Sequence, residues 1–261
     1  MRIASLQPSI TVTLKHLGKL DQLCACTRYC LEVVPELRDT NIQILHDSWT
    51  ADTEEIFATK PDLVLASVPY RMESLAAILK TGLPVLTFAP HTLADIAKDT
   101  TLLASIVDAK AAGEALNRQM EAAISDVRKI AAKLPNKKIY CEEWGKPLIH
   151  SQGWVAELIE AAGGIFLGKP GAHTDAETIS TADPDALLFA WCGAGDRVPL
   201  ARTIDQRHWH SLTAVQNKNV FCIPDEYLNT PAITLLDGLA CIAHAIHPEL
   251  FPKHPRLIQL T

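Results

Sequence analysis

The sequence has no long apolar run and no cluster of basic residues. No segment reaches the roughly 18 consecutive apolar residues that a transmembrane helix needs, so no membrane span is predicted. Lys and Arg together number 24 and Asp and Glu 30, which gives a net charge of −6. An acidic chain without a basic run argues against nucleic acid or an anionic membrane surface as the main partner.

The composition also lacks the marks of a disordered, collagen-like or coiled-coil protein. Apolar residues make up 48% and charged residues 21% of the 261 residues, as in an ordinary globular protein of one or two domains. No glycine-rich phosphate loop of the P-loop or Rossmann type is present. Glu142 and Glu143 are adjacent on an expected strand and point to opposite faces, which argues against a paired-carboxylate enzyme.

The seven cysteines are an odd number in a long chain, which argues against a disulfide scaffold. Cys24, Cys26 and Cys30 do not match a standard zinc spacing, so we expect buried structural thiols and no metal site. Met1 is not followed by the apolar region of a signal peptide. Together these features predict a cytoplasmic protein, or an extracytoplasmic one if a leader was removed.

Strand and helix signals alternate along most of the chain. Apolar runs between helices suggest parallel strands covered on both faces. We expect strands at residues 2–6, 23–27, 63–67, 85–88, 138–142, 186–191 and 220–223, and helices at 10–17, 53–59, 72–80, 155–162 and 231–246. Residues 92–134 differ, because they carry almost no strand or turn signal. An apolar stripe predicts one helix of about six turns there, ending at Pro135; its members are Ala112, Leu116, Met120, Ala123, Val127, Ile130 and Leu134.

The two halves of the chain repeat the same short motifs in the same order. The segment 58–66 resembles 181–189, and 84–88 resembles 219–223. We therefore expect an α/β fold of two Rossmann-like lobes with parallel sheets, joined by a long rigid helix. The expected division is an N-terminal lobe at 1–92, a helical linker at 93–135 and a C-terminal lobe at 136–261. The alternative is that unrelated α/β units share such connections.

The order of motifs resembles the class III substrate-binding proteins of ABC transporters, in particular the cobalamin-binding branch. The resemblance covers nearly the whole chain, and its more specific pieces are the Gly-Trp-x-x-Glu-Leu helix and a Cys-Gly after a strand. The segments that carry it are 3–11, 60–64, 82–86, 153–164, 183–185, 192–193, 209–212 and 214–215. One departure is segment 229–234, which has no arginine where the family often has one.

The resemblance implies a monomeric, non-catalytic protein that captures a corrinoid in a cleft between its lobes and works with an ABC transporter permease. No cofactor is required, although cobalamin is a possible bound ligand. The alternatives are another metal chelate such as a siderophore or haem, a bare metal ion, or a cytosolic enzyme or sensor on the same scaffold.

Aromatic residues lie at the expected strand ends, where α/β proteins bind ligands. Aromatic faces suit a flat and partly apolar macrocycle, whereas the alternative role is packing. The candidates are Trp49, Tyr70, Phe88, Trp144 and Trp191. Trp154 and Trp209 lie in expected helices and are assigned to the core.

Polar candidates come from the turns after strands. Gln7, Pro8 and Ser9 form the first strand–helix turn, where Ser9 either faces a ligand or only caps the helix. Asp225 and Tyr227 follow the last strand, and Asp225 matches a family ligand position from which it could accept amide hydrogens.

Four further residues have expected roles. Cys192 lies near a strand end and could touch the ligand, and His91 could be an axial ligand to cobalt or iron. The resemblance places Glu73 and Glu177 at the two acidic positions that meet permease arginines, one in each lobe. The alternative for this pair is that both are solvated acids at helix starts.

Overall fold

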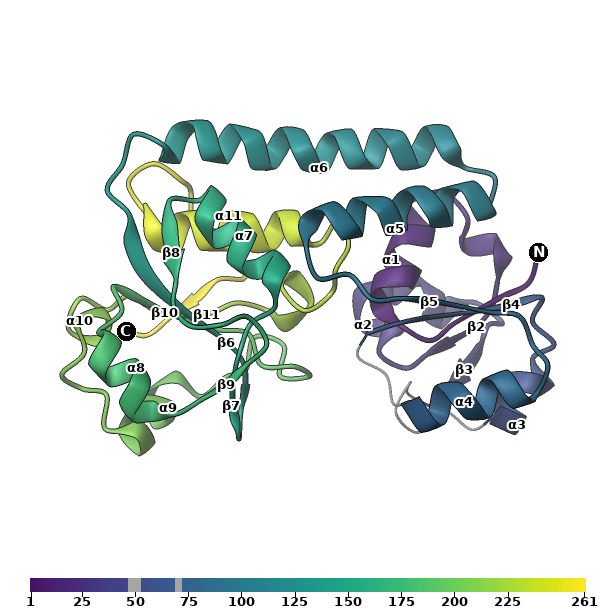
Figure 1. The fold of residues 1–261 in the computed structure, drawn as a ribbon, viewed down its shortest axis with the longest axis horizontal. Coiled ribbons are helices and arrows are strands. Elements are labelled where there is room, and N and C mark those ends of the chain that lie inside the picture. Colours follow the sequence, from purple (N-terminus) through teal and green to yellow (C-terminus); the bar gives the residue numbers. More distant parts are fainter. Residues whose placement is uncertain (47–52, 69–71) are drawn as a thin grey trace. The chain divides into compact units, whose positions relative to one another are not determined.

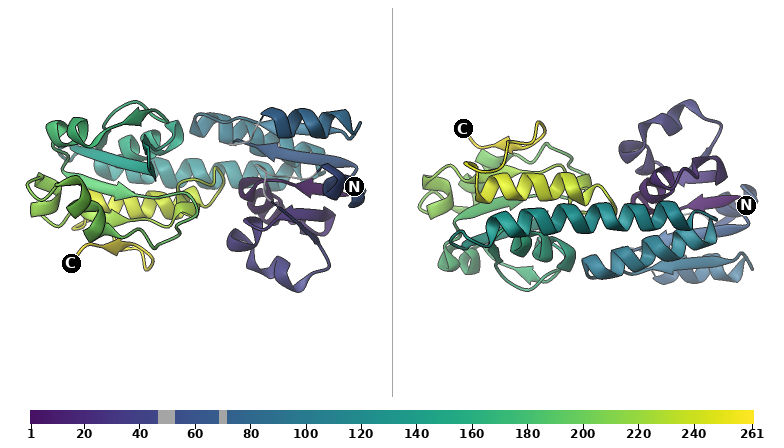
Figure 2. Two further views of the ribbon diagram at one scale, coloured as in Figure 1. Left: turned by 90° about the horizontal axis from the view of Figure 1, so that it is seen from below. Right: turned by 90° about the horizontal axis from the view of Figure 1, so that it is seen from above.

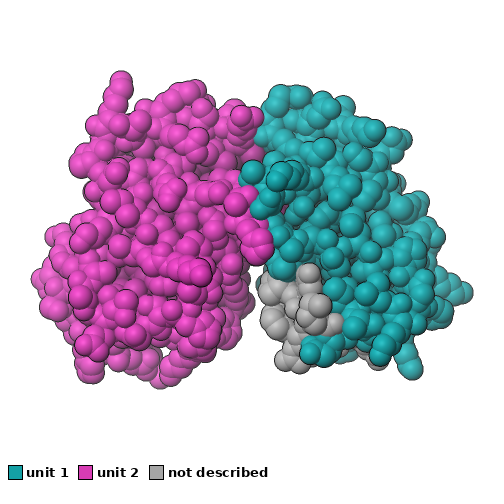
Figure 3. Space-filling model, in the orientation of Figure 1, with its two compact units in different colours: residues 1–90, 94–118 teal, residues 91–93, 119–261 magenta. Residues whose placement is uncertain are grey.

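The computed structural model describes residues 1–46, 53–68 and 72–261 (Figure 1). They divide into two compact units, coloured separately in Figure 3: unit 1 comprises residues 1–90 and 94–118, and unit 2 comprises 91–93 and 119–261. The boundary falls within helix α6 (Lys110–Ala131), which therefore contributes to both units. The sequence-based division instead set residues 93–135 apart as a linker. No helix in the described ranges is both long and apolar enough to cross a membrane.

Unit 1 is built on a parallel sheet with the strand order β3-β2-β1-β4-β5. Its strands are β1 (Ile3–Ser5), β2 (Leu23–Thr27), β3 (Gln43–Leu45), β4 (Leu63–Ser67) and β5 (Val85–Phe88). The central strands β1 and β4 are apolar up to their terminal serines, as expected for parallel strands covered on both faces. One part of the core gathers side chains from β1, β2 and β4 against Ile56 and Ile78 from two helices.

The predicted helices of unit 1 are present, with a correction at the first of them. The helix at Cys30–Val33 was not predicted, and two helices, Leu93–Ile106 and Lys110–Ala131, stand where one was expected. They are α1 (Pro8–His16), α2 (Cys30–Val33), α3 (Thr53–Ala58), α4 (Met72–Lys80) and α5 (Leu93–Ile106), with 3-10 turns at Leu20–Gln22 and Pro35–Asp39. Helix α1 begins at Pro8 and its N-cap is Gln7, so Ser9 lies inside the first turn and does not cap the helix. Proline suits this position because the first helical N–H groups need no partner within the helix.

Helix α6 carries the predicted apolar stripe over 22 residues, but the buried set differs in detail. Ile124 is buried with Leu116 and Met120, whereas Ile130 is exposed and the helix ends at Ala131 rather than at residue 134. Near its start, a Cβ on Gly113 would lie 2.4 Å from the Cβ of Ala104 in α5. Glycine therefore allows α5 and α6 to pack closely.

The sheet of unit 2 is mixed, which corrects the expectation of a purely parallel sheet. Strands β8, β6, β10 and β11 run parallel, whereas β7, β9 and β12 are antiparallel to their neighbours. The strands are β6 (Lys137–Gly145), β7 (Leu148–His150), β8 (Gly164–Phe166), β9 (His173–Thr174), β10 (Ala186–Phe189), β11 (Val220–Cys222) and β12 (Ile258–Gln259). Strand β6 is long enough to pair with β8 through its first half and with β7 through its second.

The parallel strands have the same order in both units. In unit 1 the strands lie in the spatial order β2-β1-β4-β5, and in unit 2 in the order β8-β6-β10-β11. In each unit the first of these four strands in the chain lies between the second and the third. The strands that correspond are those whose sequences resemble each other: β4 with β10, and β5 with β11. The structure therefore has two α/β units of like topology, as the motif repeat predicted.

Helices cover both faces of the sheet in unit 2 (Figures 1 and 2). They are α7 (Gly153–Ala161), α8 (Ala176–Ala182), α9 (Leu200–Arg207), α10 (Thr213–Gln216) and α11 (Leu235–Ile246), with a 3-10 turn at Asp225–Tyr227. Helices α7 and α11 pack side by side on one face. The other face buries Tyr140, Phe189 and Trp209 with apolar residues of α8 and α9. Trp209 belongs to the core, as predicted, although it follows α9 rather than lying within a helix.

Candidate functional site

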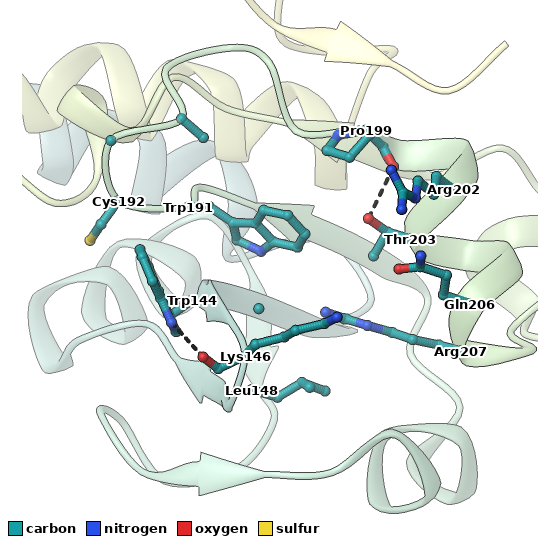
Figure 4. A pocket seen from close by; sticks show the side chains of 13 residues that line it. Trp144, Lys146, Leu148, Trp191, Cys192, Pro199, Arg202, Thr203, Gln206 and Arg207 are labelled. Atoms are coloured by element: carbon teal, nitrogen blue, oxygen red, sulfur yellow. Dashed lines mark hydrogen bonds between the residues drawn. The ribbon is translucent and has the colours of Figure 1, made fainter.

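Unit 2 contains a pocket of about 690 Å³ at the carboxyl ends of β6 and β10 (Figure 4). These two strands flank the point where the parallel strand order reverses, since β8 lies on the other side of β6. Open α/β sheets bind ligands at such points. The lining residues are Trp144, Gly145, Lys146, Leu148, Trp191, Cys192, Gly193, Ala194, Pro199, Arg202, Thr203, Gln206 and Arg207.

Two predicted aromatic residues, Trp144 and Trp191, line this pocket together. Trp144 lies within β6, not after it as predicted, because β6 continues into an antiparallel pair with β7. Its indole is 44% exposed, and its Nε1 donates to the Lys146 carbonyl at 2.8 Å. Trp191 follows β10 and is partly buried. The pocket therefore offers two aromatic surfaces, one of which is largely open to solvent.

Trp191 is held in place by three contacts. Its Nε1 donates to Glu142 Oε1 at 2.7 Å. Its ring meets Phe189 edge to face, with centroids 6.3 Å apart at 88°. A Cβ on Gly145 would lie only 2.6 Å from Trp191 Cζ2, so glycine is required where the indole crosses β6. These contacts fix the orientation of the indole before any ligand arrives.

Beneath Trp191, the carboxylate of Glu142 is fully buried and joins several side chains. The Arg207 guanidinium donates to both of its oxygens, at 2.7 and 2.8 Å, and the Tyr140 hydroxyl donates to it as well. Burial, and then the charge of Glu142, raise the pKa of Tyr140, so its hydroxyl stays protonated and remains a donor. Bidentate pairing of this kind is strong and directional. Glu142 thus connects a pocket tryptophan to a pocket arginine.

Helix α9 supplies the polar side of the pocket. Leu200 and Ile204, four residues apart, pack into the core of unit 2. Arg202 and Gln206 have the same spacing on another face of the helix and line the pocket with Arg207. Neither these three residues nor α9 was predicted from the sequence. The available signal was the 3.6-residue period of the apolar pair after Pro199.

Cys192 also lines the pocket, and its thiol is engaged by neighbouring side chains; its predicted contact with the ligand stays a prediction. It accepts from Asn229 Nδ2 at 3.2 Å and points to Glu143 Oε1 at 3.8 Å. Burial, followed by the nearby carboxylates of Glu143 and Asp225, raises the pKa of this thiol, so it is not a thiolate at neutral pH. Glu143 also accepts from Gln152, whereas Glu142 bonds other residues, which confirms that the two carboxylates diverge.

Two predicted residues of unit 2 lie outside the set that lines the pocket. Asp225 accepts from the backbone N–H groups of Gly193 at 2.8 Å and Gly195 at 2.7 Å, so its carboxylate already holds the loop after β10. The Tyr227 hydroxyl accepts from Arg256, whose guanidinium lies 5.2 Å from the ring centre. Both residues shape the loops beside the pocket.

His91 is a third predicted residue outside the pocket lining. It is exposed, and its carbonyl oxygen lies against Gly153 at the start of α7, where a Cβ would approach it to 2.3 Å. Among the residues that the structure describes, no group of three His, Cys, Asp or Glu side chains is arranged to hold a metal ion.

The predicted residues of unit 1 are mostly buried. Gln7 and Ser9 have little exposed surface, and Phe88 is 5% exposed, so the expectation that Phe88 offers a face to a ligand does not agree with the structure. Pro8 is partly buried at the start of α1. Trp49 and Tyr70 lie outside the described residues. Their predicted contacts with ligand therefore stay predictions.

Glu73 and Glu177 stand at the starts of two helices, one in each unit: α4 follows β4, whereas α8 precedes β10. Each lies in the first turn of its helix, α4 or α8, and each is exposed. An acid in this position is favoured by the partial positive charge at a helix start. The docking role expected of the pair stays a prediction.

Comparisons with known proteins relate the whole chain to one family. A cobalamin-binding protein of Halobacterium salinarum is 24% identical over 94% of this chain and 69% of its own length. A vitamin B12-binding protein of Vibrio cholerae is 25% identical over 91% of this chain and 86% of its own.

Solved structures show the same fold. A periplasmic haem-binding protein from Pseudomonas aeruginosa superimposes with a TM-score of 0.87 at 17% identity, covering 100% of this chain and 98% of that one. The periplasmic vitamin B12 binding protein of Vibrio cholerae superimposes with a TM-score of 0.76 at 23% identity, covering 94% and 95%. The sequence profile of the periplasmic binding protein family matches residues 3–227, and the chain belongs to that family.

Proposed function

We propose that this protein binds a corrinoid, or a tetrapyrrole of similar size, and presents it unchanged to an ABC transporter permease. The observation that supports this most is the pair of tryptophans, Trp144 and Trp191, on one pocket at the ends of β6 and β10. Proteins with related sequences include ones named for binding cobalamin and vitamin B12. The binding role follows from the family, whereas the ligand is our inference.

The size and surface of the pocket suit part of a large flat ligand. A volume of about 690 Å³ lies in the usual range of small-molecule sites. Covering an exposed aromatic face removes apolar surface from water and contributes about 1.5–3 kcal/mol when packing is good. Trp144 offers such surface, because the residue is 44% exposed. A macrocycle that stacks on it gains this energy without disturbing the core.

The pocket residues favour binding over catalysis. The Cys192 thiol has a raised pKa, which makes it a poor nucleophile. The Glu142 carboxylate accepts hydrogen bonds from Arg207, Tyr140 and Trp191 and has no exposed surface. We therefore propose that the protein has no catalytic residue and requires no cofactor, with the macrocycle as its cargo.

We further propose that the protein acts outside the cytoplasmic membrane, in place of the cytoplasmic location expected from its cysteines. The support is its membership of the periplasmic binding protein family. All seven cysteines are free. In this setting the exposed acids Glu73 and Glu177 are the proposed contacts with permease arginines.

Titration of intrinsic fluorescence with cyanocobalamin, haemin and a ferric siderophore tests the ligand class. We expect cyanocobalamin to quench tryptophan fluorescence, and Trp144→Ala to weaken its binding about 10- to 150-fold without lowering Tm. Trp209→Ala is the matched control: its side chain is fully buried, so it should lower Tm. The proposal is wrong if no macrocycle binds, or if Trp144→Ala leaves the affinity for every macrocycle unchanged.

A further inference from the structure

The charged side chains that line the pocket are all of one sign, although the carboxylates of Glu142, Glu143 and Asp225 lie behind that lining. Lys146, Arg202 and Arg207 line the pocket, and its described lining contains no Asp or Glu. The positive lining contrasts with the chain as a whole, in which acidic residues outnumber basic ones and the net charge is −6. A concave surface lined by one sign of charge concentrates ligands of the opposite sign. The pocket is therefore locally suited to an anion although the protein is acidic.

The three cations are not equivalent. Arg207 is paired with the buried Glu142 and is only 10% exposed, so its charge is largely used within the protein. Lys146 and Arg202 are exposed, and within the described ranges neither side chain donates a hydrogen bond or forms an ion pair. Gln206 lies one helical turn beyond Arg202 on the same face of α9 and adds amide donors.

The positions of these cations relative to the tryptophans limit the chemistry of the ligand. Lys146 comes from the β6–β7 turn directly after the exposed Trp144, and Arg202 comes from α9 on the far side of Trp191 (Figure 4). An apolar surface bordered by unpaired donors fits a flat ligand with charged groups on its edge. Guanidinium and ammonium groups prefer carboxylate and phosphate oxygens.

We infer that Lys146 and Arg202 select a macrocycle carrying an anionic group, a carboxylate or a phosphodiester, at the edge of its apolar face. This inference rests on the proposed function and adds a specificity that the family relationship does not give. Lys146 and Arg202 hold the anion while Trp144 and Trp191 cover the ring. A macrocycle whose edge groups are neutral gains only the aromatic part of this interaction.

A pair of corrinoids tests the inference: cobyrinic acid, whose side chains end in carboxylates, and its methyl ester, in which a methyl group on each carboxylate removes the charge while the corrin ring stays the same. Cyanocobalamin provides a phosphodiester arm. We expect the wild-type protein to bind the acid at least tenfold more tightly than the ester at low salt. The preference should shrink at high salt, because partly exposed charges are screened.

Variants then assign the preference to the two residues. Lys146→Met and Arg202→Met should each weaken binding of the acid about three- to fivefold, and the double variant about tenfold or more. Binding of the ester should change less than twofold. Arg118→Met in α6 and Lys253→Met near the C-terminus alter the net charge equally and lie outside the pocket lining, so they should keep the preference. A weaker cyanocobalamin complex in the double variant shows that the phosphodiester is held too; an unchanged one assigns the site to carboxylates.

The possible failures are distinguishable. Equal binding of acid and ester by the wild-type protein overturns the anion selectivity and leaves the proposed function standing. A preference that survives in the double variant, or that disappears in the two control variants as well, also overturns it. If neither corrinoid binds, and haemin does not bind either, the proposed function itself is wrong.

Discussion

The buried pair formed by Glu142 and Arg207 makes a strong prediction about stability. Glu142→Gln keeps the shape of the side chain but removes its charge, and it places an amide group against a guanidinium that is 10% exposed. Breaking one partner of a buried ion pair costs about 3–5 kcal/mol, because the other charge stays buried without compensation. The Tyr140 and Trp191 donors also lose part of their acceptor. We expect the free energy of unfolding of unit 2 to fall by about 3–4 kcal/mol.

Urea denaturation followed by tryptophan fluorescence is the appropriate assay. Of the five tryptophans in the sequence, all except Trp49 lie in unit 2, so the signal reports mainly on that unit. Arg207→Met should cost a similar amount, since it leaves the Glu142 carboxylate buried and unpaired. The double variant Glu142→Gln with Arg207→Met should cost at least about 2 kcal/mol less than the sum of the two single variants, because it leaves no uncompensated charge.

The same variants give a second measurement, on the pocket. Without Glu142, the Trp191 indole loses the acceptor of its Nε1 proton, so its emission should shift and its affinity for a macrocycle should fall. Trp191→Phe removes that donor while Glu142 and Arg207 stay paired, and it is the matched control for stability. The reasoning is refuted if Glu142→Gln costs less than about 1 kcal/mol, or if the two single-variant losses simply add.

Three further predictions concern packing, acidity and docking. Gly145→Val should displace Trp191, since even a Cβ would lie 2.6 Å from its ring, and should weaken macrocycle binding more than tenfold in a fluorescence titration; unchanged affinity would contradict this. His150 is 3% exposed and burial lowers its pKa below the usual 6.5, so the unfolded chain takes up a proton at a higher pH than the folded one. The contribution of His150 to the free energy of unfolding should be fully present above about pH 6.5, and it should fall on acidification by at most about 1.4 kcal/mol per pH unit. In His150→Phe, the urea concentration at the unfolding midpoint should depend less on pH between about pH 7.5 and 5.5 than in the wild-type protein. Glu73→Lys and Glu177→Lys should reduce uptake in a reconstituted transporter while leaving ligand affinity unchanged; full transport by the double variant would exclude the docking role.

Much of the fold could be predicted because its signals are local. Strand 63–67, helix 72–80 and strand 85–88 have the predicted bounds, since each is an apolar or periodic run bordered by Gly, Pro or polar turn residues. The repeat of motifs between the halves indicated two units of like topology. Elements without a strong local period were missed, among them the short strands β7, β8 and β9 and helix α9. The conformation of these elements depends on pairing with β6 or β7, or on packing against the core.

The candidate site divides in the same way. Trp144, Trp191 and Cys192 could be predicted because they stand at strand ends, and parallel strands bring such positions to one edge of a sheet. Arg202 and Arg207 could not, because α9 reaches the pocket only through the packing of Leu200 and Ile204 in the core.

The partner of Glu142 illustrates what only tertiary structure decided. In the sequence, Glu142 is one of two adjacent acids, and nothing near it identifies Arg207, which lies 65 residues further along the chain. Folding buries this carboxylate at the end of β6, where it needs a cation and several donors, and α9 and the end of β10 bring them to it. The sequence by itself determined the strands with strong apolar runs, such as β4, β5 and β10, and the residues at their ends, because backbone propensity and apolar period act over short distances. The pairing of charges, and with it the sign of the pocket, depends on contacts between distant segments and was decided by the packed fold.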